Sequence, residues 1–324
     1  MREMLGLGAA TAVLAAALVG VGCSSDEDGQ TELTVMSFNI WGGGANEDKP
    51  VDDTVAAIEA VDPDIVGIQE TQLEGPKCTA NSCPPLGDSV APEIAEELGY
   101  HLYEQEQAND ALWANAILSR YEISEPTPND LGVKIDADGT EVYAFNVHLD
   151  DSPYQPYQLL DIPYGQAPFL DTEEQAMRSA QQTRGPAIEL LKQDLEEADN
   201  APAFVFGDFN EPSGRDWTPS AVEAGNQPLV VAWPTTQALE DEGFVDAFRA
   251  AHTDPVERPA FTWTPSSSPD VKWDHHDRID FVLARAGGLE VEDAVIVGEG
   301  RPEADVVVRP WPSDHRAVAA KVRF

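Results

Sequence analysis

The chain has 324 residues, of which 59 are acidic and 19 are lysine or arginine, so its formal net charge at pH 7 is −40. A surface this acidic repels phosphate polyanions and argues against tight, sequence-independent binding of nucleic acid, which needs clustered basic side chains. The charge leaves room for a phosphate site that is bridged by a metal ion.

The N-terminal 22 residues are predicted to be a cleaved export signal. Leu5 to Gly22 is uncharged and apolar, and the chain turns polar after Cys23. A retained membrane span is the alternative, since the run is nearly long enough, but its glycine and alanine content and its position favour a signal peptide. Cys23 resembles the lipid-modified cysteine of bacterial lipoproteins. We expect an exported protein, either a cell-surface lipoprotein or a secreted or periplasmic protein, with an acidic tether over residues 23–31 and one functional domain over residues 32–324.

Two further cysteines, Cys78 and Cys83, are separated by four residues. In an oxidising compartment they could close a small disulfide ring that staples a loop. A metal site built from two cysteines alone is disfavoured. We expect a monomer whose contact with a membrane is limited to the lipid anchor at Cys23.

The first half of the domain alternates short apolar runs with stretches of helical spacing. The apolar runs predict buried strands over residues 33–38, 65–69, 114–120 and 141–148. Helical spacing predicts helices over residues 51–61 and 88–98.

A segment rich in proline and tyrosine separates His148 from Thr172. It is too long for an ordinary connection, which makes it a candidate lid or recognition loop, and a surface loop held by its own aromatic side chains is an equally good interpretation. Thr172 and Gln175 form a capping box that predicts a helix. Gly185-Pro186 predicts that this helix breaks and that a second helix begins there.

The second half is organised around the apolar strand 203–208, which ends in an acid. Asp208 and Asn210 are two residues apart, so both side chains point the same way if the backbone stays extended. The alternative is a polar turn in which both residues cap their own backbone. Short helices are expected over residues 217–252, and strands over residues 261–264, 280–284 and 317–324.

Polar residues follow many of these strands. Carboxylate and amide oxygens are the donors that Mg²⁺ takes, whereas zinc is disfavoured by the lack of suitable cysteine and histidine spacing. Asp280 lies within an apolar strand and needs a partner there, for which a histidine is well suited. The polar residues at strand ends are Asn39, Glu70, His148, Asp208, Asn210, Asp280, Asp314 and His315.

Six short motifs occur in an order that resembles the endonuclease/exonuclease/phosphatase superfamily. The motifs are Phe38-Asn39-Ile40-Trp41-Gly42, Gln69-Glu70-Thr71, Val147-His148-Leu149, Gly207-Asp208-Phe209-Asn210, Arg278-Ile279-Asp280-Phe281 and Ser313-Asp314-His315. The resemblance covers residues 32–324 and implies the DNase I-like fold, a four-layer α/β sandwich with two packed mixed β-sheets flanked by helices. The motifs specify no substrate, because the same set serves nucleases, inositol phosphatases and sphingomyelinases.

The resemblance also implies a role for each strand-end residue. Glu70 is the principal Mg²⁺ ligand, with Asn39 beside it, and Asp314 contacts this metal indirectly or binds a second one. Mn²⁺ and Ca²⁺ are the expected substitutes. Asp208 orients or deprotonates the attacking water, and Asn210 holds the phosphate. Asp280 pairs with His315, which contacts the phosphoryl oxygens, and His148 is a phosphate ligand or the general acid.

Several neighbouring residues are interpreted as structural. Trp41 stands where abasic-site nucleases of the family carry an acid, which speaks against that repair activity. His275 and His276 are expected to be exposed on a loop, Asp150 and Asp151 to cap the following loop, and Trp263 and Trp311 to pack at the rim of the core.

The expected function is therefore an exported, Mg²⁺-dependent phosphodiesterase for a small or lipid-derived substrate. The alternatives are an extracellular nuclease that uses the same site, and a catalytically silent surface-binding protein on the same scaffold.

Overall fold

The computed structural model describes residues 30–75, 84–269 and 271–324. The predicted export signal, Cys23, most of the tether and the Cys78–Cys83 ring lie outside the described residues. Within the described part of the chain, no helix is long and apolar enough to cross a membrane.

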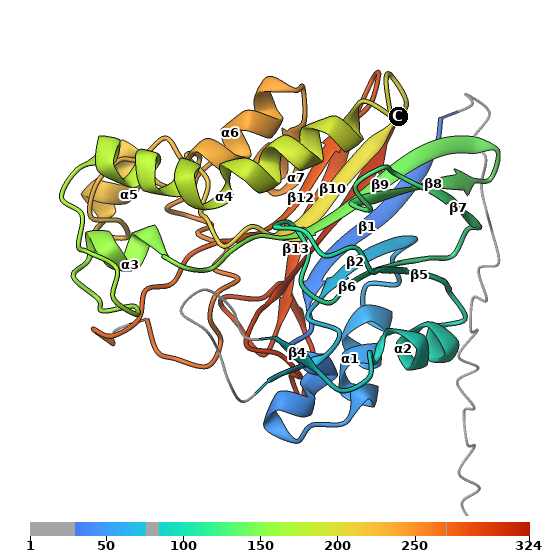
Figure 1. The fold of residues 1–324 in the computed structure, drawn as a ribbon, viewed down its shortest axis with the longest axis horizontal. Coiled ribbons are helices and arrows are strands. Elements are labelled where there is room, and N and C mark those ends of the chain that lie inside the picture. Colours follow the sequence, from blue (N-terminus) through green and yellow to red (C-terminus); the bar gives the residue numbers. More distant parts are fainter. Residues whose placement is uncertain (1–29, 76–83, 270) are drawn as a thin grey trace, which may run out of the picture. The chain divides into compact units, whose positions relative to one another are not determined.

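Two mixed β-sheets form the centre of the domain (Figure 1). One sheet has seven strands in the order β14-β13-β15-β1-β2-β6-β5, and the other has six in the order β11-β12-β10-β9-β8-β7, while β3 and β4 pair separately. The strands are β1 (Glu32–Asn39), β2 (Ile65–Gln69), β3 (Leu73–Glu74), β4 (Pro85–Leu86), β5 (His101–Gln105), β6 (Asn115–Ser119), β7 (Ile123–Pro126), β8 (Gly132–Ala137), β9 (Thr140–His148), β10 (Ala203–Asp208), β11 (Val245–Asp246), β12 (Asp280–Arg285), β13 (Glu290–Gly298), β14 (Val306–Val307) and β15 (Ala317–Arg323).

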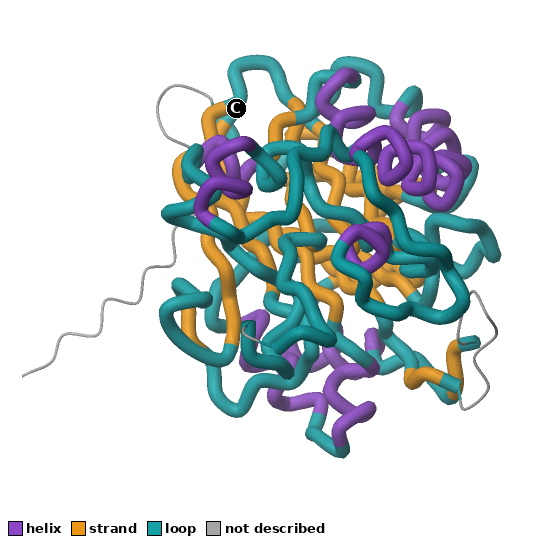
Figure 2. The backbone as a smooth tube through the Cα atoms, turned by 90° about the vertical axis from the view of Figure 1, so that its left-hand side faces the viewer, coloured by secondary structure: helices purple, strands orange, loops and turns teal. Residues whose placement is uncertain are grey.

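Helices cover the outer face of each sheet, which completes the predicted four-layer α/β sandwich (Figures 1 and 2). Ile58 of α1 and Ile94 of α2 pack on the seven-stranded sheet, and Leu191 of α4 and Leu239 of α6 pack on the six-stranded sheet. A third apolar cluster fills the space between the sheets. The helices are η1 (Gly42–Glu47), α1 (Val51–Glu59), α2 (Ala91–Leu98), α3 (Gln155–Leu159), α4 (Glu173–Leu195), α5 (Pro219–Ala224), α6 (Pro234–Asp241) and α7 (Ala247–Ala251).

The two sheets approach each other closely near the strand ends that carry the polar residues. Gly67 of β2 faces Phe206 of β10, and a Cβ atom at position 67 would lie only 2.7 Å from that side chain. Asn146 of β9 crosses between the sheets: its Nδ2 donates to the carbonyl of Ile68 over 2.9 Å, and its Oδ1 accepts from Gln69 Nε2 over 2.6 Å. These buried hydrogen bonds fix how one sheet sits on the other.

The register of the strands places the candidate residues at one edge of both sheets. Asp208, the last residue of β10, lies opposite His148 on parallel β9 and opposite Asp280 on antiparallel β12. In the other sheet, parallel β1 and β2 pair Asn39 with the residue that precedes Glu70. Because Asp280 is the first residue of β12 rather than its last, the antiparallel strand delivers it to the same edge.

Most predicted elements are confirmed to within a few residues, but the strand predicted over residues 261–264 is wrong. This stretch makes only isolated bridges, from Trp263 to Asp277 and from Trp263 to His315. Among the strands of four or more residues, β5, β7, β8 and β13 were not predicted.

The predicted helix break at Gly185-Pro186 is also wrong, since α4 is continuous from Glu173 to Leu195. The predicted capping is present, because the Thr172 side chain accepts from the Gln175 amide. Pro186 lies on the exposed face of the helix, where the backbone carbonyl that loses its partner can reach water. The missing hydrogen bond therefore does not end the helix.

Candidate active site

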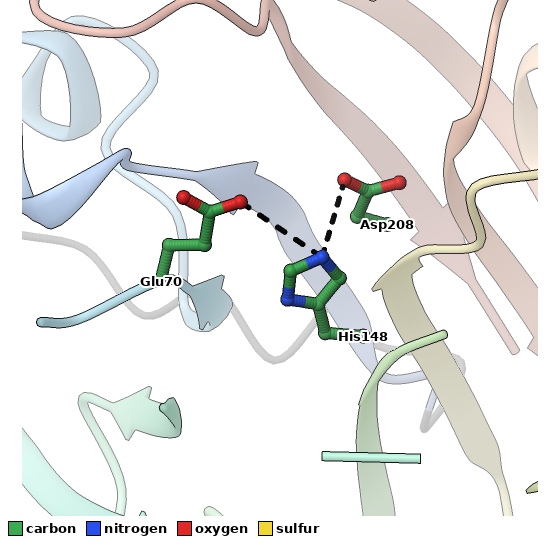
Figure 3. Close-up of side chains that lie close together, drawn as sticks. All are labelled: Glu70, His148 and Asp208. Carbon is green, nitrogen blue, oxygen red and sulfur yellow. Dashed lines mark ion pairs between the residues drawn. The ribbon is translucent and has the colours of Figure 1, made fainter. Parts of the chain in front are cut away.

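Two carboxylates, of Glu70 and Asp208, and the imidazole of His148 meet where strands of the two sheets end (Figure 3). His148 Nε2 lies 3.8 Å from Glu70 Oε1 and 3.7 Å from Asp208 Oδ2. Asn39 ties the two carboxylates together, because its Nδ2 donates to Glu70 Oε1 over 2.8 Å and lies 3.1 Å from Asp208 Oδ2. Residues that are up to 169 positions apart in the chain thus share one cluster.

A histidine–aspartate pair adjoins this cluster. His315 Nδ1 lies 2.9 Å from Asp280 Oδ2, and its Nε2 lies 3.5 Å from Asp208 Oδ2. The backbone amide of Asp280 donates to Thr262 Oγ1, which helps to hold the carboxylate. Both histidines of the site, His148 and His315, therefore direct Nε2 towards the same oxygen of Asp208.

Burial and charge set the protonation of this pair. Burial alone lowers the pKa of His315, but the nearby carboxylates of Asp280 and Asp208 outweigh it and raise the pKa well above the usual value. Burial raises the pKa of Asp280, and His315 partly offsets that rise. The imidazole is thus held in its charged form beside a carboxylate, with Nε2–H facing the cluster.

The oxygen donors at the site fit a divalent cation. Glu70 Oε2 and Asp314 Oδ1 are buried carboxylate oxygens without a hydrogen-bond partner among the described residues. Burial, together with the charges of Glu70 and Asp208, raises the pKa of Asp314 to about 7, against the opposing effect of His315. Acidic oxygens that repel one another in a buried place are the donors that Mg²⁺ prefers, whereas Asn39 presents its Nδ2 to them and its Oδ1 accepts from the Trp41 amide.

The backbone around the site is strained at two non-glycine residues. Glu70 has φ of 57° and Asn210 has φ of 47°, both in the left-handed region that favours glycine. The chain after Asp208 is therefore not extended, and Asp208 Oδ1 accepts from the Asn210 amide over 2.9 Å, as in the alternative polar turn. Asn210 Nδ2 donates to the carbonyl of Leu149 over 3.0 Å.

The cluster lies in a cleft of about 520 Å³. Aromatic and acidic side chains form much of its wall, and none of the described residues that line it is a lysine or an arginine. The lining residues are Glu70, Glu74, Asn109, Asp110, Leu112, Trp113, His148, Leu149, Asp150, Asp151, Tyr154, Tyr157, Tyr164, Asp208, Asn210, Trp263, Ile279, Asp314 and His315. Of the eight predicted site residues, all but buried Asn39 and Asp280 line the cleft.

Two predictions about aromatic and histidine side chains near the site are wrong. Trp263 is a wall of the cleft rather than core packing, since its ring centroid lies 4.9 Å from that of His315. His276 is only 5% exposed, and its Nε2 lies 2.8 Å from Ser267 Oγ. His275 is half-buried against Gln227.

The structural interpretations of Trp311 and Asp150 are confirmed, and that of Asp151 as a cap is wrong. Trp311 is buried and packs against Phe38, with ring centroids 5.2 Å apart. Asp150 Oδ1 accepts from the Ser152 amide over 2.9 Å and so caps the loop that follows. Asp151 accepts from the hydroxyl of Tyr164 instead.

Residues 36–315 match the model of the Endonuclease/Exonuclease/phosphatase family. The chain belongs to this family. Membership indicates a hydrolase of phosphate ester bonds, in a family whose members typically depend on a divalent metal.

A relative and several solved structures resemble the chain over most of its length. An uncharacterized protein of Caenorhabditis elegans, F14F9.5, is 29% identical over 310 residues, which cover 90% of this chain and 91% of that protein. The 3′ phosphatase NExo from Neisseria, solved with a product DNA hairpin, is 18% identical with a TM-score of 0.52, over 89% of this chain and 98% of that one. An endonuclease/exonuclease/phosphatase from Beutenbergia cavernae is 18% identical with a TM-score of 0.51, over 90% and 72%. At these identities the solved structures support the DNase I-like fold alone.

Proposed function

We propose that the protein is an exported phosphodiesterase that depends on a divalent metal and hydrolyses a small or lipid-derived phosphodiester. The observation that carries the proposal is the convergence of Glu70, His148, Asp208 and His315 on one cleft. Hydrolysis of a phosphodiester needs a positioned water, a proton acceptor, and groups that offset the charge on the phosphoryl oxygens. The cluster supplies each of these from its own side chains or from a bound cation.

Glu70 and Asp314 would supply carboxylate oxygens to Mg²⁺, and Asn39, whose Nδ2 donates to Glu70 Oε1, would hold that ligand in place. When bound, the cation offsets negative charge on the phosphate and on the oxygen that leaves. Burial is the largest cause of the raised pKa of Asp314, and repulsion from the Glu70 and Asp208 carboxylates is a further cause. A bound cation would relieve that repulsion.

The remaining side chains would position the reactants and move protons. Asp208, whose orientation is fixed by the Asn39 amide and the Asn210 backbone, would orient the water and accept its proton. His315 would donate from Nε2 to a phosphoryl oxygen while Asp280 holds its Nδ1. His148 would give a proton to the leaving oxygen. Asn210 carries a second amide proton that could bind the phosphate.

The cleft supports a small substrate over long nucleic acid. The described lining residues include no lysine or arginine that could neutralise the flanking phosphates of a polynucleotide, and the whole chain carries a charge of −40.

The test is an assay of the full chain with Mg²⁺ and with chelator, against bis-(para-nitrophenyl) phosphate, para-nitrophenyl phosphate, DNA and sphingomyelin. Chelator-sensitive turnover of the diester that is lost in Asp208→Ala supports the proposal. Turnover of DNA in preference to the small diesters would instead identify a nuclease. A folded protein that turns over none of them at several salt concentrations would favour a silent binding protein.

A further inference from the structure

A row of three tyrosines forms one wall of the cleft, and the proposed hydrolysis gives it no role. Tyr154, Tyr157 and Tyr164 all come from the segment between β9 and α4. The ring centroids of Tyr154 and Tyr157 lie 5.0 Å apart and those of Tyr157 and Tyr164 lie 5.9 Å apart, each pair edge to face. Tyr157 and Tyr164 are the partly exposed members of the row, and Tyr154, only 5% exposed, packs against Tyr157.

Each hydroxyl group in the row donates to a carboxylate. Tyr154 donates to Asp277 over 2.8 Å, Tyr157 donates to Asp274, and Tyr164 donates to Asp151. Burial and these carboxylates raise the pKa of each phenol above its usual value, so the rings remain neutral. A phenol that donates to an anion gains electron density in its ring, which strengthens the attraction of the ring face for a cation.

The acidic side chains around this wall also favour a cation. Glu74, Asp110, Asp150 and Asp151 line the cleft beyond the catalytic cluster. Burial raises the pKa of Glu74, and the charges of Glu70 and Asp151 raise it further. Burial likewise raises the pKa of Asp150, with a contribution from Asp151. Neighbouring carboxylates contribute to both shifts, so this side of the cleft is acidic.

The arginine whose charge acts on Asp150 is already engaged with other groups. Arg184 lowers the pKa of Asp150, but it is fully buried, and its Nη1 donates to Gln155 and lies 3.4 Å from Glu211. It does not line the cleft. The wall therefore offers aromatic faces and negative charge together.

We propose that the tyrosine wall is a binding subsite for an organic cation, a substituted ammonium group carried by the phosphodiester substrate. The inference rests on the proposed phosphodiesterase function and narrows its substrate class. A substituted ammonium is weakly hydrated and gains from aromatic faces, and the neighbouring carboxylates add Coulombic attraction. A second phosphate at the same place would meet only repulsion.

Two substrates that share a leaving group test the subsite directly. Para-nitrophenyl phosphocholine carries a quaternary ammonium, and para-nitrophenyl neohexyl phosphate is its isostere with carbon in place of nitrogen. We expect kcat/KM for the cationic ester to be greater by about tenfold or more. Equal values for the two esters would overturn the inference while leaving the phosphodiesterase function intact.

Variants then test whether the tyrosine wall causes the preference for the cationic ester. Tyr164→Leu removes one ring, and Asp151→Asn removes a charge while leaving an oxygen that can accept from Tyr164. Each should reduce the preference by about threefold or more. Tyr103→Phe is the matched control, because the Tyr103 hydroxyl also donates to a carboxylate, Asp130, but the residue does not line the cleft. A preference that survives both cleft variants would refute the assignment of this wall.

Binding separates the two proposals if neither ester is hydrolysed. Calorimetric titration of the full chain with phosphocholine and with neohexyl phosphate, in the presence of Mg²⁺, measures the subsite without turnover. Tighter binding of phosphocholine supports the cation subsite even where the hydrolase assignment fails. Equal affinity, or tighter binding of the neutral isostere, overturns it.

Discussion

Asp277→Ala tests how far the cleft wall depends on one buried carboxylate. Asp277 is 1% exposed and accepts three hydrogen bonds from distant parts of the chain. Its Oδ2 accepts from the Tyr154 hydroxyl over 2.8 Å, and its Oδ1 accepts from Trp217 Nε1 over 2.9 Å and from Gln227 Nε2 over 3.2 Å. Removing the carboxylate leaves three buried donors without an acceptor.

The expected loss in the free energy of unfolding combines the cost of the unpaired donors with the gain from removing a buried charge. A buried donor left unpaired costs about 1–3 kcal/mol, so three cost roughly 3–9 kcal/mol. Part of this is recovered, because burial raises the pKa of Asp277 and removing the group removes the cost of burying its charge. We expect the free energy of unfolding to fall by about 3–5 kcal/mol, against a typical total of about 5–15 kcal/mol.

Urea unfolding, followed by tryptophan fluorescence, measures this loss from the midpoint and slope of the transition. Asp277→Asn is the matched variant, because it keeps the shape of the side chain and one acceptor oxygen. Its free energy of unfolding should lie between that of the wild type and that of Asp277→Ala. A loss below about 1 kcal/mol in Asp277→Ala would refute the reasoning, because the three donors would then have found other partners.

Three further outcomes are expected. Glu70→Gln should raise the Mg²⁺ concentration needed for half-maximal activity by about tenfold or more, since it removes a charged ligand; an unchanged Mg²⁺ titration would contradict that role. Asp208→Ala should lower kcat by about a hundredfold to ten-thousandfold with a cooperative unfolding transition retained, and turnover near the wild-type value would exclude it as the base. Burial lowers the pKa of His276 from 6.5, so the unfolded chain takes up a proton first and stability falls as the pH drops below 6.5. In the wild type, His276 lowers the free energy of unfolding by at most about 1.4 kcal/mol per pH unit over this range, and His276→Gln should not show this contribution. Urea midpoints of both proteins at pH 7 and pH 5 measure the difference.

The fold and the candidate residues at the strand ends were predictable because their signals are local. An apolar run that ends in a polar residue, such as Ala203 to Asp208, marks both a buried strand and the place where its side chain emerges. The longer strands that were missed are interrupted by charged residues. In β13 the exposed acids Glu290, Glu292 and Asp293 precede the buried end of the strand, so no continuous apolar run exists.

The tyrosine wall could not be predicted, because its hydrogen bonds join residues that no local pattern relates. Tyr154 and Asp277 are 123 positions apart, and Tyr157 and Asp274 are 117 apart. Seen alone, Asp274-His275-His276-Asp277 is a polar stretch typical of an exposed loop, and only its partners make it a buried support. Nucleases and small-molecule phosphatases of the family share these motifs, so the order of the motifs cannot select a substrate. Selectivity must come from the walls of the cleft, which is why the organic-cation subsite had to be inferred from the contacts of the tyrosines rather than from the motifs.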